Sequence, residues 1–159
     1  MSRKIFAALA LTLMSTTATI AAGVQSEIDI EILIGRTEVM HDQTARGLVV
    51  LGVRQASPDG EQLLPADPER NQYSRLYDAV GRYNNLRDLA CSSGVISHSL
   101  CNEERFIPLW YAGRARPDTS PDGLRRMAED MQNRTVPLWT AVCERAEARS
   151  GDKDFCAIE

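Results

Sequence analysis

Lysine and histidine are nearly absent from this chain. Lys4 and Lys153 are the only lysines, so arginine supplies almost all of the positive charge, and His41 and His98 are the only histidines. The arginines are dispersed among acidic residues, which fits the codon usage of a GC-rich genome better than an arginine-rich recognition surface. The formal charge of −4 at pH 7 argues against nucleic acid as the main partner, because duplex binding depends on neutralising phosphates.

Several motifs that carry chemistry are also missing. The chain has no Cys-x-x-Cys redox pair and no closely spaced cysteine pairs of the kind that bind structural zinc. It has no glycine-rich phosphate-binding loop, no Gly-x-Ser-x-Gly nucleophile elbow and no stripe in which basic and aromatic residues interleave. We therefore predict no cofactor, no bound metal and no nucleic-acid partner.

The first 23 residues have the layout of a cleaved secretory signal peptide. Arg3 and Lys4 precede an apolar run from Ile5 to Met14, and small residues end the segment at Ala21-Ala22-Gly23. The run is shorter than the roughly 20 residues that a membrane-spanning helix needs, and an uncleaved anchor is the alternative. We predict a mature chain, 24–159, that is periplasmic or secreted, forms one domain and keeps no membrane span. Loss of the two basic residues takes its formal charge to about −6.

All four cysteines lie after this segment: Cys91, Cys101, Cys143 and Cys156. An oxidising compartment favours their pairing as two disulfides. Of the three possible connectivities we favour the two local bonds, Cys91–Cys101 and Cys143–Cys156, because each joins a predicted helix end to the segment that follows it. In the chain-entropy model, loops this short stabilise the folded state by about 2.5–3 kcal/mol each.

Apolar residues recur at helical spacing along most of the chain, which predicts a mainly α-helical, compact domain of about five helices. The clearest helix begins at Asp67-Pro68, where the aspartate caps the helix and the proline fits its first turn, and it ends near Gly94. One apolar stripe follows this helix, with Arg75, Arg82 and Arg87 largely outside it.

Three further helices are predicted in the second half of the chain. One covers about 99–111, and another starts at Ser120-Pro121-Asp122, again with a cap followed by proline. Pro137 is expected to break or kink that helix, because proline in a helix interior costs about 3 kcal/mol. The last helix then runs from Pro137 to about Arg149 and ends at Ser150-Gly151-Asp152.

Segment 26–56 is ambiguous in the sequence. From Ile28 to Ile34 isoleucine occupies every second position, which is the period of a strand. A second apolar run, from Leu48 to Leu51, lies between two glycines. One long helix or a helical pair is favoured over a two-stranded element, because the rest of the chain is helical and an isolated hairpin is only marginally stable.

Three groups of polar residues resemble parts of catalytic or metal sites. Glu38 and His41 have the Glu-x-x-His spacing of half a dimetal site, but the chain lacks the second motif, so with Asp42 they are interpreted as a surface polar cluster. His98 lies between two serines and is interpreted as a loop histidine with capping serines. Glu103, like Glu38, acts as a general acid only if a second carboxylate faces it across a cleft.

The candidate binding surface lies on and beside loop 113–119. This loop and loop 57–67 are the predicted contact elements, since both are long enough to project and neither carries a core stripe. The candidate binding residues are of types enriched at protein–protein hot spots: Trp110, Tyr111, Arg114 and Arg116.

Three functions fit these observations. We predict a non-enzymatic binding protein of the bacterial envelope, such as an accessory subunit, an inhibitor or an immunity-type protein that masks another envelope protein. The first alternative is a small secreted cell-wall hydrolase with paired carboxylates, which requires an acid of raised pKa facing a second carboxylate. The second alternative is small-ligand binding in a helical bundle, which requires a buried apolar pocket near the tryptophans.

Overall fold

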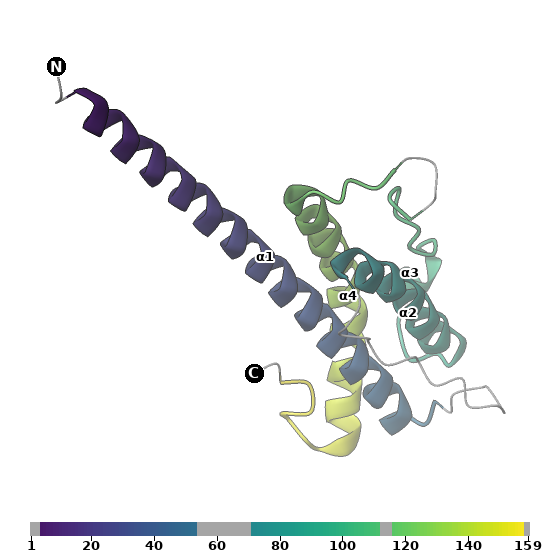
Figure 1. The fold of residues 1–159 in the computed structure, drawn as a ribbon. Coiled ribbons are helices and arrows are strands. Elements are labelled where there is room, and N and C mark those ends of the chain that lie inside the picture. Colours follow the sequence, from purple (N-terminus) through teal and green to yellow (C-terminus); the bar gives the residue numbers. More distant parts are fainter. Residues whose placement is uncertain (1–3, 54–70, 112–115, 158–159) are drawn as a thin grey trace.

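The computed structural model contains four helices (Figure 1) in the part of the chain that it describes, which is 4–53, 71–111 and 116–157, with side chains described from residue 27 onward. The helices are α1 (Lys4–Val50), α2 (Gln72–Ser92), α3 (His98–Asn102) and α4 (Pro121–Ser150). The prediction of a mainly α-helical chain is confirmed, and these residues include no strand. The count of about five helices is wrong, because α4 continues through the proline expected to divide it.

The ambiguous segment 26–56 is helical to the end of α1, so its strand interpretation is wrong; residues 54–56 lie outside the described residues. Gly52 follows the helix with a φ of 84°, and the N–H of Val53 bonds to the carbonyl of Leu48 at 2.9 Å, a glycine-based helix end. Figure 1 shows the N-terminal part of α1 extending well beyond the other helices.

The buried face of α1 explains why the sequence pattern was ambiguous. Ile30 and Ile34 are buried at helical spacing, but the same face continues through the polar side chains of Thr37, His41 and Thr44. Each of the two threonines donates to the carbonyl four residues earlier, at 2.9 and 2.7 Å. The face therefore has the period of a helix without being apolar along its whole length.

α2 starts after Asn71, whose side chain accepts a hydrogen bond from the N–H of Ser74 at 2.9 Å. The predicted start at Asp67-Pro68 lies outside the described residues. At the other end, Gly94 has a φ of 69° and the N–H of Val95 bonds to the carbonyl of Ala90 at 2.9 Å, so the predicted glycine end is confirmed.

The helix predicted over 99–111 is wrong in extent, because α3 ends at Asn102 and irregular chain follows. Asn84 of α2 holds that chain: its amide nitrogen donates to the carbonyl of Phe106 and its amide oxygen accepts from the N–H of Phe106, both at 2.9 Å. These bonds occupy the N–H and the carbonyl of Phe106, which would bond within the helix if α3 continued.

The arginines expected outside the apolar stripe of α2 are in fact largely buried. The side chains of Arg75, Arg82 and Arg87 are only 10%, 10% and 8% exposed. Arg87 donates to the carbonyls of Cys101 and Glu103, the latter through a short contact. A stripe of apolar residues does not predict such burial, because the guanidinium groups find acceptors on other elements.

α4 runs without interruption through Pro137. Its start and end are as predicted, with Ser120 as the side-chain cap and Gly151 following the helix at a φ of 77°. The helix is buried on both sides of the proline, through Thr135 and Leu138. This burial stabilises the helical path although the proline lacks an N–H to donate.

α1, α2 and α4 pack against one another around a shared core. α1 lies close to α4 at Gly47, where an added Cβ would lie 2.8 Å from Cγ1 of Val142. No helix among the residues with described side chains is both long and apolar enough to cross a membrane.

The two disulfides have the local pairing favoured by the sequence. Cys91–Cys101 joins the last turn of α2 to α3, with the Cα atoms 5.6 Å apart. Cys143–Cys156 joins α4 to the C-terminal tail, with the Cα atoms 5.9 Å apart. Each bond fastens a long helix to the segment that follows it.

Gln43 of α1 also binds the C-terminal tail. Its amide nitrogen donates to the carbonyl of Ala157 at 2.9 Å, and its amide oxygen accepts from the indole N–H of Trp139 at 2.8 Å. The tail is thus held to α4 by a disulfide and to α1 by a buried amide.

Candidate binding surface

Two large apolar side chains next to the predicted binding residues are exposed. Ile107 is 61% exposed and Leu109 is 86% exposed, although Pro108 between them is buried. The chain turns at this point, because the N–H of Tyr111 bonds to the carbonyl of Pro108 at 2.9 Å. Leu109 is therefore at the tip of a tight turn, and we refer to residues 106–111 as the apolar turn.

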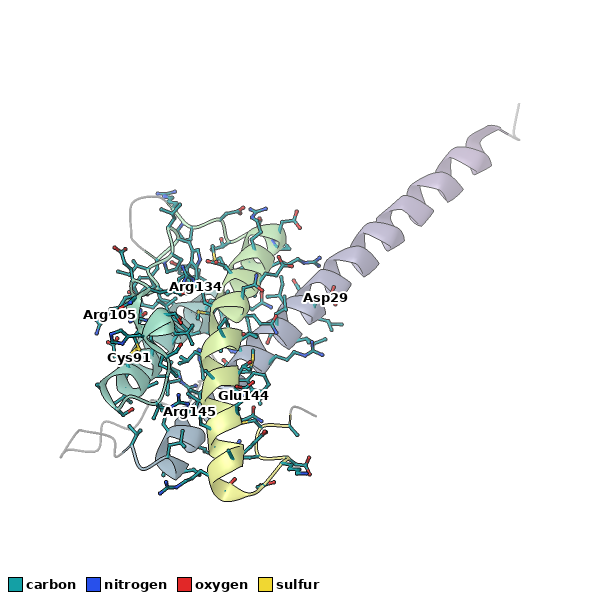
Figure 2. All side chains as sticks on the ribbon, turned by 180° about the vertical axis from the view of Figure 1, so that it is seen from behind. Asp29, Cys91, Arg105, Arg134, Glu144 and Arg145 are labelled. Atoms are coloured by element: carbon teal, nitrogen blue, oxygen red, sulfur yellow. A yellow bond between two sulfur atoms is a disulfide. The ribbon has the colours of Figure 1, made fainter. Side chains whose placement is uncertain are left out.

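Phe106 anchors the apolar turn in the core. Its ring is buried, lies edge-on to Tyr83 with ring centroids 6.0 Å apart, and has the guanidinium of Arg134 5.2 Å from its centre. Figure 2 shows Arg134 on α4, on the side of the chain segment that carries Arg105. With the two bonds from Asn84, the turn is held by both α2 and α4.

Trp110 and Tyr111, two of the predicted binding residues, pack against two tyrosines of α2 and form an aromatic cluster with them. Tyr111 stacks on Tyr77 with ring centroids 4.3 Å apart, and Trp110 lies edge-on to Tyr73 at 6.3 Å. A hydrogen bond to Tyr77, together with partial burial, raises the pKa of the Tyr111 hydroxyl. Tyr77 is itself 44% exposed, so the cluster reaches the surface beside the turn.

An open hollow of about 440 Å³ lies beside Trp110. Its lining comes from the apolar turn, the chain before α4 and the first turns of α4, and includes Leu109, Trp110, Arg116, Pro117, Asp118 and Met127. The indole N–H of Trp110 is buried and has no hydrogen-bond acceptor among the described residues. Two predicted binding residues, Trp110 and Arg116, thus meet at one hollow, whereas Arg114 lies outside the described residues, as does the whole of loop 57–67.

The wall of the hollow at Asp118 is fixed by a set of bonds. One carboxylate oxygen of Asp118 accepts from the hydroxyl and the N–H of Ser120 at 2.6 and 3.1 Å, and the other accepts from Arg126 at 2.7 Å. The bonds from Ser120, helped by Arg126, hold the pKa of Asp118 below its usual range. Gly123 lets this chain close on α4, because a Cβ there would lie 2.0 Å from the carbonyl oxygen of Asp118.

The predicted polar cluster of Glu38, His41 and Asp42 is divided between two faces of α1. Glu38 accepts two hydrogen bonds from Arg75, at 2.6 and 2.9 Å, and Asp42 accepts a short one from Arg82. The bonds with Glu38 raise the pKa of Arg75. Among the described residues, no three His, Cys, Asp or Glu side chains are arranged to hold a metal ion.

His41 faces α4 and is fully buried. Its Nε2 is 3.0 Å from the hydroxyl of Thr135, and that hydroxyl donates to the carbonyl of Met131 at 3.0 Å. Because the proton of the Thr135 hydroxyl is already donated to Met131, we assign the imidazole proton to Nε2. Nδ1 is then an acceptor to which no residue in the described part of the chain donates. Burial, and secondarily the charge of Arg82, lowers the pKa of His41 to about 3.

The other predicted chemistry-bearing residues lie on the surface. His98 is exposed at the start of α3, and the hydroxyls of Ser97 and Ser99 bond to each other at 2.9 Å. Ser97 makes no side-chain cap, so the prediction of capping serines is wrong there. Glu103 is exposed and pairs with Arg134 at 3.0 Å. These contacts match neither a nucleophile with its base nor a carboxylate pair across a cleft.

Sequence reasoning missed the residues that complete the hollow. Leu109 is adjacent to a predicted binding residue, but nothing in the sequence signals its exposure. The Ser-Pro start of α4 predicts a helix over Arg126 and Asp130, which are four residues apart and therefore lie on the same face. This spacing is the one feature of the sequence that groups them at the hollow.

Comparison with known proteins adds no further assignment: the chain matches no protein-family model, no curated protein and no solved structure.

Proposed function

We propose that this chain is an exported, non-catalytic binding protein of the bacterial envelope that binds another envelope protein through the apolar turn and the adjoining hollow. The observation that carries the proposal is Leu109, 86% exposed at the tip of a turn that α2 and α4 both hold in place. Exposed apolar side chains gathered with aromatic residues are typical of protein interaction sites. A scaffold that fixes them in advance reduces the entropy lost on binding.

Export is part of this proposal, with residues 1–23 as a signal peptide and 24–159 as one periplasmic or secreted domain. Two disulfides favour an oxidising compartment. The part of α1 that would be removed extends beyond the other helices (Figure 1), so cleavage would leave the later part of α1 packed against α2 and α4.

The two alternatives have weaker support. A hydrolase needs a carboxylic acid that holds its proton, but Glu38 and Glu103 each bind an arginine and the pKa of Asp118 is lowered. Small-ligand binding needs a buried apolar pocket near the tryptophans. The hollow beside Trp110 is open and partly lined by charged residues, which suits contact with another protein better.

Photocrosslinking in the producing cell tests the proposal. A benzophenone amino acid at position 109 should give one adduct of defined mass with an envelope protein. The same group at exposed Ala148, near the other end of α4, is the matched control and should give none. Mass spectrometry of the protein should show that residues 1–23 are absent. Identical adducts from both positions, or peptidoglycan hydrolysis by the pure protein, would refute the proposed function.

A further inference from the structure

We infer that the outward face of α1 binds the same face of a second copy of this chain, with the two helices antiparallel. The inference goes beyond the proposed function, because it concerns a different surface from the apolar turn and the hollow. It rests on the apolar and charged side chains that α1 exposes.

Apolar side chains follow this face at the spacing of a coiled coil. Ile28, Ile32 and Val39 are 48%, 47% and 41% exposed. Together with Gly35 they are four, three and four residues apart, the alternation that keeps one side of a helix against a partner helix. We refer to these four residues as the outer seam. Large apolar side chains gathered on one exposed face mark an interaction surface.

The charges beside the outer seam favour a protein over a lipid surface. Glu27 and Glu31 are exposed at its N-terminal end, and Asp29 is partly exposed. Helices that lie on membranes carry lysine and arginine on their polar face, and anionic lipids repel carboxylates. The occupant of the seam is therefore another helix.

The outer seam is complementary to itself when two copies run in opposite directions. Ile28 of one copy then lies opposite Val39 of the other. Ile32 lies opposite Gly35, and a residue as small as glycine or alanine leaves room for the isoleucine, since nothing lies within 4 Å of the Cβ position there. Each pair occurs twice, because a two-fold axis relates the copies.

The charged residues further along α1 favour this direction over a parallel one. Asp42 and Arg46 continue the spacing of the outer seam toward the end of the helix. Parallel helices would place each of them against its own copy, and such like-charge contacts are unfavourable. In the antiparallel pair both lie beyond the last apolar contact, that of Val39 with Ile28.

Arg36 makes the edge of the seam complementary in charge. Its side chain is exposed, and no ion pair joins it to another described residue. Arg36 and Asp29 each follow a seam residue by one position, so both lie on the same side of the seam. The two-fold axis brings Arg36 of one copy near Asp29 of the other. Asp29 pairs with Arg125 at 3.4 Å, and a partly exposed carboxylate can accept from a second guanidinium.

Sedimentation of the disulfide-bonded protein, from micromolar to millimolar concentration, measures this association. We expect a monomer–dimer equilibrium, and Ile32→Asp should raise its dissociation constant about 100-fold, because the dimer would bury a carboxylate in the seam. Val49→Asp is the matched control. Val49 is 62% exposed on the same helix but lies beyond the antiparallel overlap, so this variant should retain the dimer.

Reversal of charge tests the register of the two helices. Arg36→Glu should raise the dissociation constant about fivefold, because two exposed ion pairs are replaced by repulsion. The matched variant Arg46→Glu, which lies outside the overlap, should leave it unchanged.

Photocrosslinking tests the direction of the helices. Trypsin cuts after Arg36 and Arg46, so a benzophenone amino acid at position 28 should be found joined to peptide 37–46 of the second copy. A link to the peptide that ends at Arg36 would refute the antiparallel arrangement.

The inference is also wrong if the protein remains monomeric at millimolar concentration, if Ile32→Asp and Val49→Asp weaken the dimer equally, or if a monomer floats with phosphatidylglycerol vesicles instead. In each of those cases a specific crosslink from position 109 would still support the proposed function, so the two failures are distinguishable.

Discussion

Helix α1 meets its two long neighbours through different chemistry. Toward α4 it presents Gly47 and the buried His41, with close contact between the helices. Toward α2 it presents Glu31 and Glu38, seven residues apart, and Arg75 binds both at 2.6 Å. The interface with α4 is close-packed and its printed ion pair, between Asp29 and Arg125, is partly exposed. The interface with α2 instead has largely buried arginines, Arg75 and Arg82, that pair with carboxylates of α1.

Because the two interfaces differ in chemistry, we expect different substitutions to destabilise them. A dense interface is sensitive to added volume and to any buried charge, because it has neither space nor solvent to accommodate them. An interface of long charged side chains tolerates changes in volume, and its pairs instead specify which turns of the two helices lie opposite each other. Four experiments follow, from the largest expected effect to the smallest.

Added volume should break the interface with α4. We expect Gly47→Leu to destabilise the protein by about 3 kcal/mol, because the first added carbon would already lie 2.8 Å from Val142 and 3.4 Å from Ala146. The measurement is urea unfolding followed by circular dichroism. Gly35→Leu on the same helix is the control, since a Cβ there meets nothing within 4 Å. Equal losses for both variants would show that the helix contact is looser than described.

Acid should weaken the same interface through His41. The pKa of His41 is about 3 in the folded state and near 6.5 in the unfolded state. Between these two values the imidazole is protonated in the unfolded chain and neutral in the folded chain. The stabilisation is complete above pH 6.5 and is lost as the pH falls toward 3, by about 2 kcal/mol between pH 7.5 and 5.

The variant His41→Leu should flatten this pH dependence, whereas His98→Leu, at an exposed position, should retain it. Unfolding free energies measured at several pH values distinguish the two histidines. A pH dependence that persists in His41→Leu would assign the effect to other groups.

Loss of charge should affect the interface with α2 less. We expect Arg75→Met to cost about 1–2 kcal/mol, because Glu38, only 16% exposed, would lose its partner while the apolar stem is retained. Arg105→Met removes an exposed pair with Asp88 and should cost less than about 0.5 kcal/mol. A double-mutant cycle with Glu38→Gln isolates the pair, and a coupling energy near zero would contradict its role.

The smallest effect is expected on the outward side of α1, which meets neither neighbour. Gly35→Ala should stabilise the protein by about 0.5–1 kcal/mol, because alanine favours the helix and the added methyl group has open space. Thermal unfolding at neutral pH measures the gain. A loss of stability would indicate that this side of the helix is covered by another surface in solution.

The features predicted correctly from the sequence depend on residues close together in the chain. The start of α4 at Ser120-Pro121, its end at Gly151 and the two disulfides all follow from local capping or short loop closure. Residue type alone also selected Trp110 and Arg116, which the fold brings to one hollow.

The features that were missed depend on partners far apart in the chain. α3 is short because Asn84 binds the backbone of Phe106, 22 residues away. α4 continues through Pro137, which is itself exposed, because Thr135 and Leu138 on either side of it are buried, Thr135 against His41 of α1. No local sequence rule predicts that burial. Likewise Asp118 and Met127 become part of the binding surface only when the apolar turn is brought against α4.

The disulfide pattern also bears on how the chain acquires its structure. Each bond joins a cysteine to the next one in the sequence, at separations of 10 and 13 residues. If the chain emerges into an oxidising compartment from its N-terminus, pairing the cysteines in order of appearance gives the native connectivity directly. Because each cysteine pairs with the next one to emerge, no disulfide has to be reduced and re-formed with another cysteine. The disulfides can therefore form in the order in which the chain is synthesised.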